Sequence, residues 1–221
     1  MASIAVFDIN ETTLDLTPVR AVIDGLVAPE GGGRAWFGRL LQLSMTLTAT
    51  GGYVDFSTLA RQALEAVAAT GDRAIVDDEA WAGVVTAMGS LDPHPDVAPA
   101  LDRLRDGGWT TVALTNSAPA TVTWQLQRAG LAPRFDHVLS VDAVRCYKPS
   151  PEPYRHAAEV VGVEPGELWM VACHDWDLVG ARAVGLSTAF VTRPGQSWAP
   201  TFPPPDLTVA DFGELADRLL G

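Results

Sequence analysis

The segment VFDINETTLD, residues 6–15, places a carboxylate directly after a short apolar run. Asp8 closes the run, and Thr12 follows it within the same segment. A carboxylate held against a positioned electrophile can attack it and form a covalent intermediate. A threonine hydroxyl nearby can donate a hydrogen bond to that carboxylate or to an anionic substrate. We therefore predict that Asp8 is a nucleophile and that Thr12 supports it.

Further chemistry-bearing residues follow other apolar runs. Thr115 and Asn116 close one run, Lys148 lies in the loop RCYKPSPEPY after another, and Asp177 follows a third. In an open parallel sheet, ligands bind beyond the carboxyl ends of the strands, so these side chains should meet at one rim. A lysine there would keep carboxylates ionised and would stabilise negative charge that develops during a reaction. Asp177 would hold the lysine in place or orient a water molecule.

The elements that must position these residues alternate along the chain. Short apolar runs, partly β-branched, predict strands at residues 3–8, 110–116, 137–141, 168–174 and 187–193. Segments of helical character lie between them at residues 97–108, 118–131, 151–162 and 177–185. This order predicts an α/β fold with a doubly wound parallel sheet.

Residues 15–90 interrupt the alternation. Helical periodicity runs through residues 34–50 and 55–70, and no strand is predicted in this stretch. We therefore expect an α/β core formed by residues 1–14 and 91–221, with a helical cap inserted at residues 15–90.

The composition limits the classes of partner. The formal net charge of −12 disfavours nucleic acid and anionic membrane surfaces. No apolar stretch is long enough to span a bilayer, and no basic segment followed by an apolar run stands near the N-terminus. The two cysteines suit a reducing cytoplasm. We expect a cytoplasmic protein that binds a small anionic substrate at a local basic site, and we leave a homodimer open.

Four motifs, taken in order, resemble those of the haloacid dehalogenase superfamily of hydrolases. They are Asp8 with Thr12, then Thr115, then Lys148, then Asp177, each expected at a strand end. The resemblance covers nearly the whole chain and implies a Rossmann-like core, a cap domain and an aspartyl nucleophile.

Position 10 separates the branches of this superfamily. Its phosphatases resemble one another in carrying a second Asp two residues after the nucleophile, where this chain has Asn10, and a magnesium-binding Asp where it has Cys173. An amide cannot act as a general acid, so phosphoryl transfer is disfavoured. A halide leaves without protonation. We therefore expect no metal ion and no cofactor.

Two segments are similar to those of the 2-haloacid dehalogenase branch. One contains Trp176, Asp177, Gly180 and Ala181, and the other contains Lys148 and Tyr154. The resemblance also implies that Phe56, in the cap segment YVDF, lies beside the pocket. His174 matches a water-positioning Asn of this branch, and it could instead act as a general base.

The cap arginine that accepts the halide in this branch is matched here by Phe37. Arg39 lies two residues further along, so on a helix it faces another direction. Either Arg39 replaces that arginine through a shifted register, or Asn10, Asn116 and aromatic edges form the halide site, or the substrate is not a haloacid.

These observations lead to one principal hypothesis. The protein hydrolyses a small 2-haloalkanoate: Asp8 attacks the carbon with inversion, and water directed by His174, Asp177 and Lys148 cleaves the ester. Backbone amides after the first strand would hold the substrate carboxylate. The predicted substrate-binding residues are Asn10, Thr115, Asn116, Phe37, Arg39, Phe56, Tyr154 and Trp176. The alternatives are a magnesium-dependent phosphatase or phosphonatase and a non-catalytic binding protein on the same fold.

Overall fold

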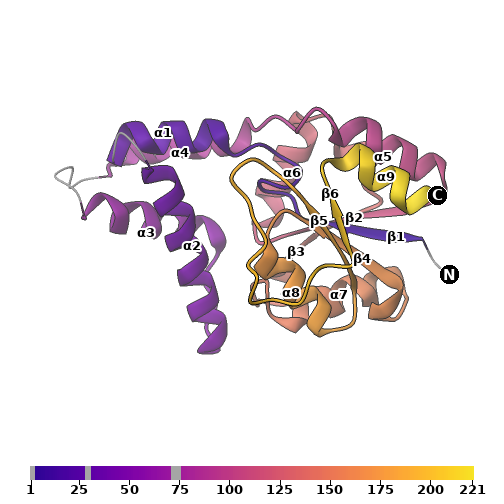
Figure 1. Cartoon of the computed structure of the whole chain (residues 1–221). Coiled ribbons are helices and arrows are strands. Elements are labelled where there is room, and N and C mark those ends of the chain that lie inside the picture. Colours follow the sequence, from indigo (N-terminus) through magenta and orange to yellow (C-terminus); the bar gives the residue numbers. More distant parts are fainter. Residues whose placement is uncertain (1–2, 28–30, 71–75) are drawn as a thin grey trace.

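A parallel six-stranded sheet forms the core of the protein (Figure 1). The computed structural model describes residues 3–27, 31–70 and 76–221. The strand order is β3-β2-β1-β4-β5-β6, and every neighbouring pair is parallel. The strands are β1 (Ile4–Phe7), β2 (Thr110–Thr115), β3 (His137–Ser140), β4 (Leu168–Ala172), β5 (Ser187–Val191) and β6 (Leu207–Val209). The predicted α/β class with a parallel sheet is confirmed.

Helices cover both faces of the sheet (Figure 1). Successive residues of a strand point to opposite faces, so Ala5 and Phe7 of β1 join one hydrophobic cluster while Ile4 and Val6 join the other. The first cluster includes residues of α5 (Val97–Asp106), α6 (Pro119–Arg128) and α9 (Phe212–Leu220). The second includes residues of α7 (Pro151–Val161) and α8 (Asp175–Ala183). Short 3-10 helices lie at Ala132–Arg134, Val141–Ala143 and Pro165–Glu167.

In the described residues between β1 and α5, four helices extend beyond one end of the sheet (Figure 1). They are α1 (Thr17–Val27), α2 (Gly32–Ala49), α3 (Phe56–Ala68) and α4 (Asp78–Gly89). Asp55 and Asp77 begin α3 and α4 by accepting hydrogen bonds from the backbone N–H groups of Thr58 and Ala80. No strand occurs in the described part of residues 15–90. The exact boundaries of a cap at residues 15 and 90 remain a prediction.

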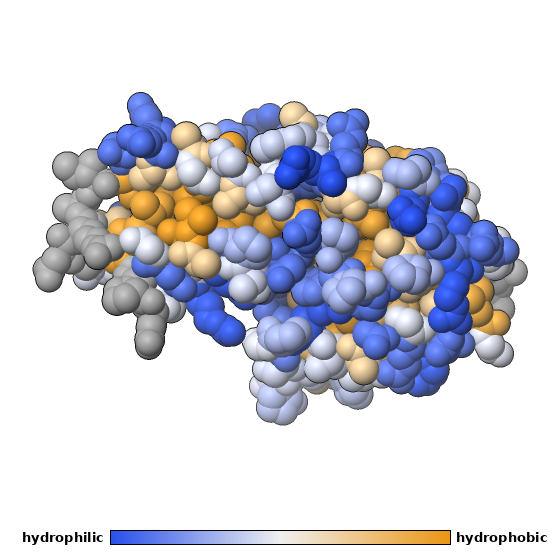
Figure 2. Space-filling model, turned by 90° about the horizontal axis from the view of Figure 1, so that it is seen from above, coloured by the Kyte–Doolittle hydropathy of each residue, from blue (hydrophilic) through white to orange (hydrophobic). Residues whose placement is uncertain are grey.

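Apolar atoms reach the surface at the cap end of the molecule when it is seen from above (Figure 2). Val22 of α1 and Val85 of α4 are among the exposed large hydrophobic side chains. Within the described ranges, no helix has both the length and the apolar character needed to cross a membrane.

The sequence pattern did not predict the last two elements. β6 has only three residues and follows a proline-rich stretch, and α9 then packs against α5. In α9, Asp211 caps the helix by accepting a hydrogen bond from the Glu214 backbone N–H at 2.8 Å. A three-residue edge strand is too short to show the periodicity on which strand prediction depends.

Candidate active site

A buried lysine joins two carboxylates at the carboxyl end of the sheet. Lys148 Nζ donates to Asp8 Oδ1 at 2.9 Å, to Asp177 Oδ2 at 2.6 Å and to the Leu114 carbonyl at 3.1 Å. These three contacts use all the hydrogens of the ammonium group, so the lysine is held in one position. The structure therefore brings together Asp8, Lys148 and Asp177 from separate segments.

The second oxygen of Asp8 accepts two further hydrogen bonds. Thr12 Oγ1 donates to Asp8 Oδ2 at 2.7 Å, and His174 Nδ1 lies 3.3 Å from the same oxygen. Thr12 is itself fixed, because its hydroxyl oxygen accepts the backbone N–H of Cys173 at 2.9 Å. The Thr13 hydroxyl donates to the Asp8 carbonyl at 2.6 Å and closes the turn after β1. The carboxylate is thus fixed through both of its oxygens.

Charges around Asp8 keep it ionised although it is buried. Burial alone would raise the pKa of Asp8, but the Lys148 ammonium and the His174 imidazole hold that pKa well below its usual range. Burial raises the pKa of Asp177, against the opposing effect of Lys148. Burial would lower the pKa of Lys148, yet Asp177 and Asp8 raise it. The site therefore contains an ionised carboxylate beside a charged ammonium group.

Tyr154 lies behind Asp177 and not in the substrate cavity. Its hydroxyl donates to Asp177 Oδ1 at 2.6 Å, and the side chain is fully buried. Gly180 makes this contact possible, because a Cβ at that position would lie 2.8 Å from the Tyr154 hydroxyl and 2.4 Å from the Pro149 carbonyl. The expectation that Tyr154 binds substrate is therefore corrected: its position lets it orient Asp177.

A small cavity opens onto Asp8 between the core and the cap. Its volume is about 20 Å³, roughly the space of one water molecule. The lining residues are Asp8, Asn10, Phe37, Leu41, Phe56, Thr115, Asn116, His174 and Trp176. Asp8 is only 5% exposed, so the cap shields it from bulk solvent.

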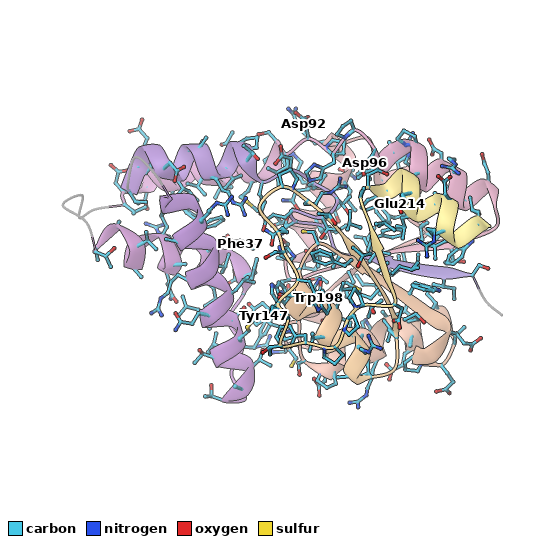
Figure 3. All side chains as sticks on the ribbon, in the orientation of Figure 1. Phe37, Asp92, Asp96, Tyr147, Trp198 and Glu214 are labelled. Carbon is cyan, nitrogen blue, oxygen red and sulfur yellow. The ribbon has the colours of Figure 1, made fainter. Side chains whose placement is uncertain are left out.

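Two aromatic rings lie against His174. Trp176 stacks on it with ring centroids 5.2 Å apart, and Phe37 lies 5.9 Å away. Phe37 points from α2 towards the core (Figure 3). Two elements that lie far apart in the sequence, α2 and α8, therefore hold the imidazole in place.

Two amides of the predicted set also have fixed positions. Asn10 Nδ2 donates to Ser117 Oγ at 3.0 Å, and Asn116 Oδ1 accepts the Lys148 backbone N–H at 3.1 Å. Asn10 Oδ1 is buried and has no hydrogen-bond partner in the part of the chain that the structure describes. Asn10, which lines the cavity, therefore keeps one buried amide oxygen without a hydrogen-bond partner in the described residues.

Arg39 lies outside this cavity, contrary to the prediction that it binds substrate. The residue is exposed, and its guanidinium donates to Gln42 Oε1 at 2.7 Å. Two residues correspond to about 200° around a helix, so Arg39 and Phe37 cannot face the same cavity. Of the halide sites considered from the sequence, only the one formed by Asn10, Asn116 and aromatic edges coincides with the cavity lining.

Residues that the sequence pattern did not predict surround the site. Glu11 Oε2 lies 2.9 Å from His174 Nε2, and the Glu11 carboxylate also pairs with Arg20 of α1. Arg193 Nε donates to the Thr12 carbonyl at 3.1 Å. Glu11 and Arg20 do not stand at predicted strand ends, and Arg193, which ends the strand predicted at residues 187–193, was not assigned to the site. Only the folded chain shows that they reach Asp8 and its neighbours.

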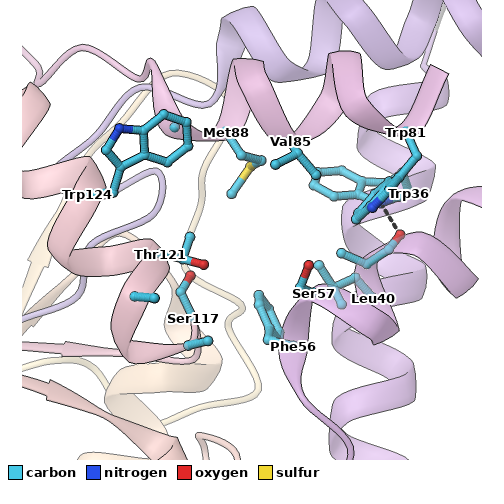
Figure 4. Close-up of a pocket in the computed structure, with 14 residues that line it drawn as sticks. Trp36, Leu40, Phe56, Ser57, Trp81, Val85, Met88, Ser117, Thr121 and Trp124 are labelled. Carbon is cyan, nitrogen blue, oxygen red and sulfur yellow. Dashed lines mark hydrogen bonds between the residues drawn. The ribbon is translucent and has the colours of Figure 1, made fainter. Parts of the chain in front are cut away.

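A larger apolar cavity of about 220 Å³ lies next to the small cavity at Asp8, between α2, α3, α4 and α6 (Figure 4). Phe56 lines both cavities. Trp36, Trp81 and Trp124 contribute to its walls, and none of the described lining residues has a titratable side chain. The hydroxyl groups in its lining therefore have no base beside them within that lining, and the acid–base groups belong to the smaller cavity.

Comparison with known proteins agrees with this geometry. The family model of haloacid dehalogenase-like hydrolases matches residues 3–185. The chain is 33% identical over 199 residues to an (S)-2-haloacid dehalogenase of Xanthobacter autotrophicus, with 89% of this chain and 77% of the relative covered. It is 30% identical over 215 residues to (S)-2-haloacid dehalogenase 4A of Burkholderia cepacia, with 95% and 91% covered.

Solved structures show the same relationship. The L-2-haloacid dehalogenase of Xanthobacter autotrophicus superimposes with a TM-score of 0.91 at 28% identity, over 100% of this chain and 99% of that one. The same enzyme with covalently bound chloropropionic acid gives a TM-score of 0.89 at 28% identity, with 100% and 99% covered. The chain therefore belongs to the haloacid dehalogenase-like hydrolases, in the branch of the L-2-haloacid dehalogenases.

Proposed function

We propose that this protein hydrolyses small 2-haloalkanoates and that Asp8 is the nucleophile. One observation carries the proposal: an ionised, shielded carboxylate opens onto a small cavity and is fixed by Lys148, Thr12 and His174. Desolvation and fixed orientation both favour attack by a carboxylate on carbon.

The first step forms an ester. An Asp8 oxygen bonds to C2 of the substrate with inversion, while the carbon–halogen bond breaks and its electron pair leaves with the halide. Oδ1 accepts one hydrogen bond and Oδ2 accepts two, so Oδ1 is the less restrained oxygen and makes the attack. A halide leaves without a proton, which agrees with the amide of Asn10 where a phosphatase would have an acid.

A 2-haloalkanoate is larger than the 20 Å³ cavity, so the lining would move apart to admit it and would then contact both the substrate carboxylate and the halide. Thr115 and Asn116, with backbone amides after β1, would hold the substrate carboxylate. Asn10 and the aromatic edges of Phe37, Phe56 and Trp176 would surround the departing halide. The relative that carries covalently bound chloropropionic acid supports an intermediate of this kind.

Water then cleaves the ester. It attacks Cγ of Asp8, directed by His174 together with Lys148 and Asp177, and the products are a 2-hydroxy acid, a halide and one proton. Lys148 remains beside the reacting carboxyl group, since Asp177 and the Leu114 carbonyl hold it. The charged ammonium group stabilises the negative charge that develops on the reacting carboxyl group.

No observation favours either alternative function. Phosphoryl transfer would need carboxylates where this chain has Asn10 and Cys173, and Cys173 Sγ instead receives a contact from Thr12 Oγ1 at 3.3 Å. A binding protein would not require a carboxylate held ionised in a shielded cavity.

We also propose a cytoplasmic location, since Cys146 and Cys173 are both free. The homodimer that the sequence leaves open remains a prediction.

Halide release from 2-chloro- and 2-bromoalkanoates of increasing chain length tests the proposal. The wild type should release halide, whereas Asp8→Asn should lose the activity by about 10⁶-fold, to background. Asp106→Asn, at an exposed position in α5, is a matched control and should behave as the wild type. Equal release by the wild type and Asp8→Asn would remove Asp8 from the mechanism.

A further inference from the structure

Glu11 contacts His174 from the side opposite Asp8. Its Oε2 lies 2.9 Å from His174 Nε2, and His174 Nδ1 lies 3.3 Å from Asp8 Oδ2. The side chains of Glu11 and His174 are 7% and 5% exposed. The imidazole therefore bridges two buried carboxylates, one of which is the nucleophile.

Several contacts hold Glu11 in this position. Its φ is 66°, in the left-handed region that side chains with a Cβ disfavour. Arg20 of α1 pairs with the carboxylate, Gln196 Nε2 donates to Oε1 at 3.1 Å, and His94 Nε2 contacts the Glu11 carbonyl at 2.9 Å. A disfavoured conformation fixed by so many partners is typical of functional sites.

Hydrolysis of the ester requires a base near the cavity. Among the described side chains that line it, only Asp8 and His174 carry groups that can accept a proton, and Asp8 is esterified at this stage. Asp177 does not line the cavity, and its two oxygens accept hydrogen bonds from Lys148 and Tyr154. Within the described lining, His174 is therefore the residue that can take a proton from water.

We propose that Glu11 is a positioning residue that directs His174 Nδ1 towards Asp8, so that His174 acts as the general base in hydrolysis of the aspartyl ester. This inference rests on the proposed function. A carboxylate that accepts from one ring nitrogen fixes which nitrogen faces the reaction, as in a hydrolytic triad.

The protonation steps balance around one cycle. In the resting enzyme, the charged imidazole donates to Asp8 and to Glu11. Ester formation removes the charge of Asp8, and the proton on Nδ1 leaves to solvent alongside the released halide. Nδ1 then accepts a proton from water as the water oxygen bonds to Cγ. The Cγ–Oδ1 bond breaks, the other water hydrogen passes to the departing alkoxide, and the resting state returns.

The surroundings of His174 agree with an imidazole whose protonation depends on the charge of Asp8. Burial alone would lower the pKa of His174, but contacts with Cys173, Asp8 and Glu11 raise it well above its usual range. Among the described residues, the titratable and charged groups that face or interact with the Asp8–His174–Glu11 cluster are Cys173, Arg20, Lys148, His94 and Asp177. Phe37 and Trp176 lie against the imidazole ring and carry no charge. Loss of the Asp8 charge is thus the change that frees Nδ1.

Rapid mixing of enzyme with 2-bromopropionate separates the two steps. Glu11→Gln should release about one bromide per active site in a burst, accumulate an Asp8 adduct in the intact-protein mass spectrum, and turn over about 10²-fold more slowly. His174→Gln should accumulate the same adduct, which keeps the test decisive if Glu11→Gln does not fold. Glu79→Gln, at an exposed position of α4, is the matched control and should match the wild type.

The pH dependence of ester hydrolysis shows whether His174 acts as a base or as a hydrogen-bond donor. In single turnovers of the wild type, ester hydrolysis should accelerate as pH rises and then level off. A rate that falls with rising pH would overturn the inference, as would equal losses of burst and turnover without an adduct in both variants. Absence of bromide release by the wild type would instead refute the proposed function.

Discussion

Replacement of Lys148 by methionine tests how the buried charges stabilise the fold. Lys148 is 1% exposed and lies between Asp8 and Asp177, whose side chains are 7% and 0% exposed. Methionine preserves much of the apolar stem but leaves both carboxylates without the ammonium group. Removing one partner from a buried ion pair costs about 3–5 kcal/mol. For a chain of this size, the melting temperature of Lys148→Met should fall by about 6–20 °C.

The pH dependence of this loss follows from the carboxylate pKa values. Lys148 lowers the pKa of Asp8 in the folded protein, so the stability from this ionised group is present above its usual pKa. That stability is lost as pH falls towards the folded pKa. In Lys148→Met, the buried carboxylates take up protons at higher pH. The loss of folding stability in Lys148→Met relative to the wild type should therefore be largest near pH 7 and decrease as pH falls.

Urea unfolding at pH 7 and at lower pH measures this loss of unfolding free energy. The slope of the unfolding free energy against urea concentration should be the same for both proteins. The double variant Asp8→Asn/Lys148→Met should recover part of the stability, because it removes one of the uncompensated charges. A loss below about 1 kcal/mol at pH 7, or a loss independent of pH, would refute the reasoning that these charges are buried and coupled.

Two further predictions concern the pocket. Arg39→Ala should leave kcat/KM for 2-haloacids within about twofold of the wild type, because Arg39 is exposed and bonds to Gln42. A tenfold fall in kcat/KM would instead indicate that Arg39 binds the halide. Activity should also persist in EDTA, since Asn10 and Cys173 replace the carboxylates of a magnesium site. Loss of activity that Mg²⁺ restores would favour phosphatase-type chemistry.

The sequence predicted the sheet and the polar residues at its rim because both depend on local pattern. β1 and β2, which lead into Asp8 and end at Thr115, are almost wholly buried, and parallel strands direct their carboxyl ends to one edge. The helical periodicity within residues 15–90 predicted the insertion, and the family resemblance matched it to a cap and supported Asp8 as the nucleophile. The predicted family, fold class and enzyme class are confirmed by the comparisons.

The contacts of the cap and of the turn after β1 could not be predicted in this way. Glu11 reaches His174 only because the turn bends back with a positive φ, and a single glutamate carries no periodic signal. Phe37 and Arg39 lie on one helix, and only its packing shows which of them faces the cavity. Tyr154 was predicted at the site, but its role behind Asp177 depends on the close approach at Gly180.

A single turnover in ¹⁸O-labelled water, with enzyme in excess over a 2-haloacid, tests the central claim most directly. If Asp8 bonds to carbon, the hydroxyl oxygen of the product comes from Asp8 and the product carries no label. Mass spectrometry should then find ¹⁸O in the peptide that contains Asp8. Label in the product of that first turnover, with none in the peptide, would show that water attacks the substrate directly and would contradict the account.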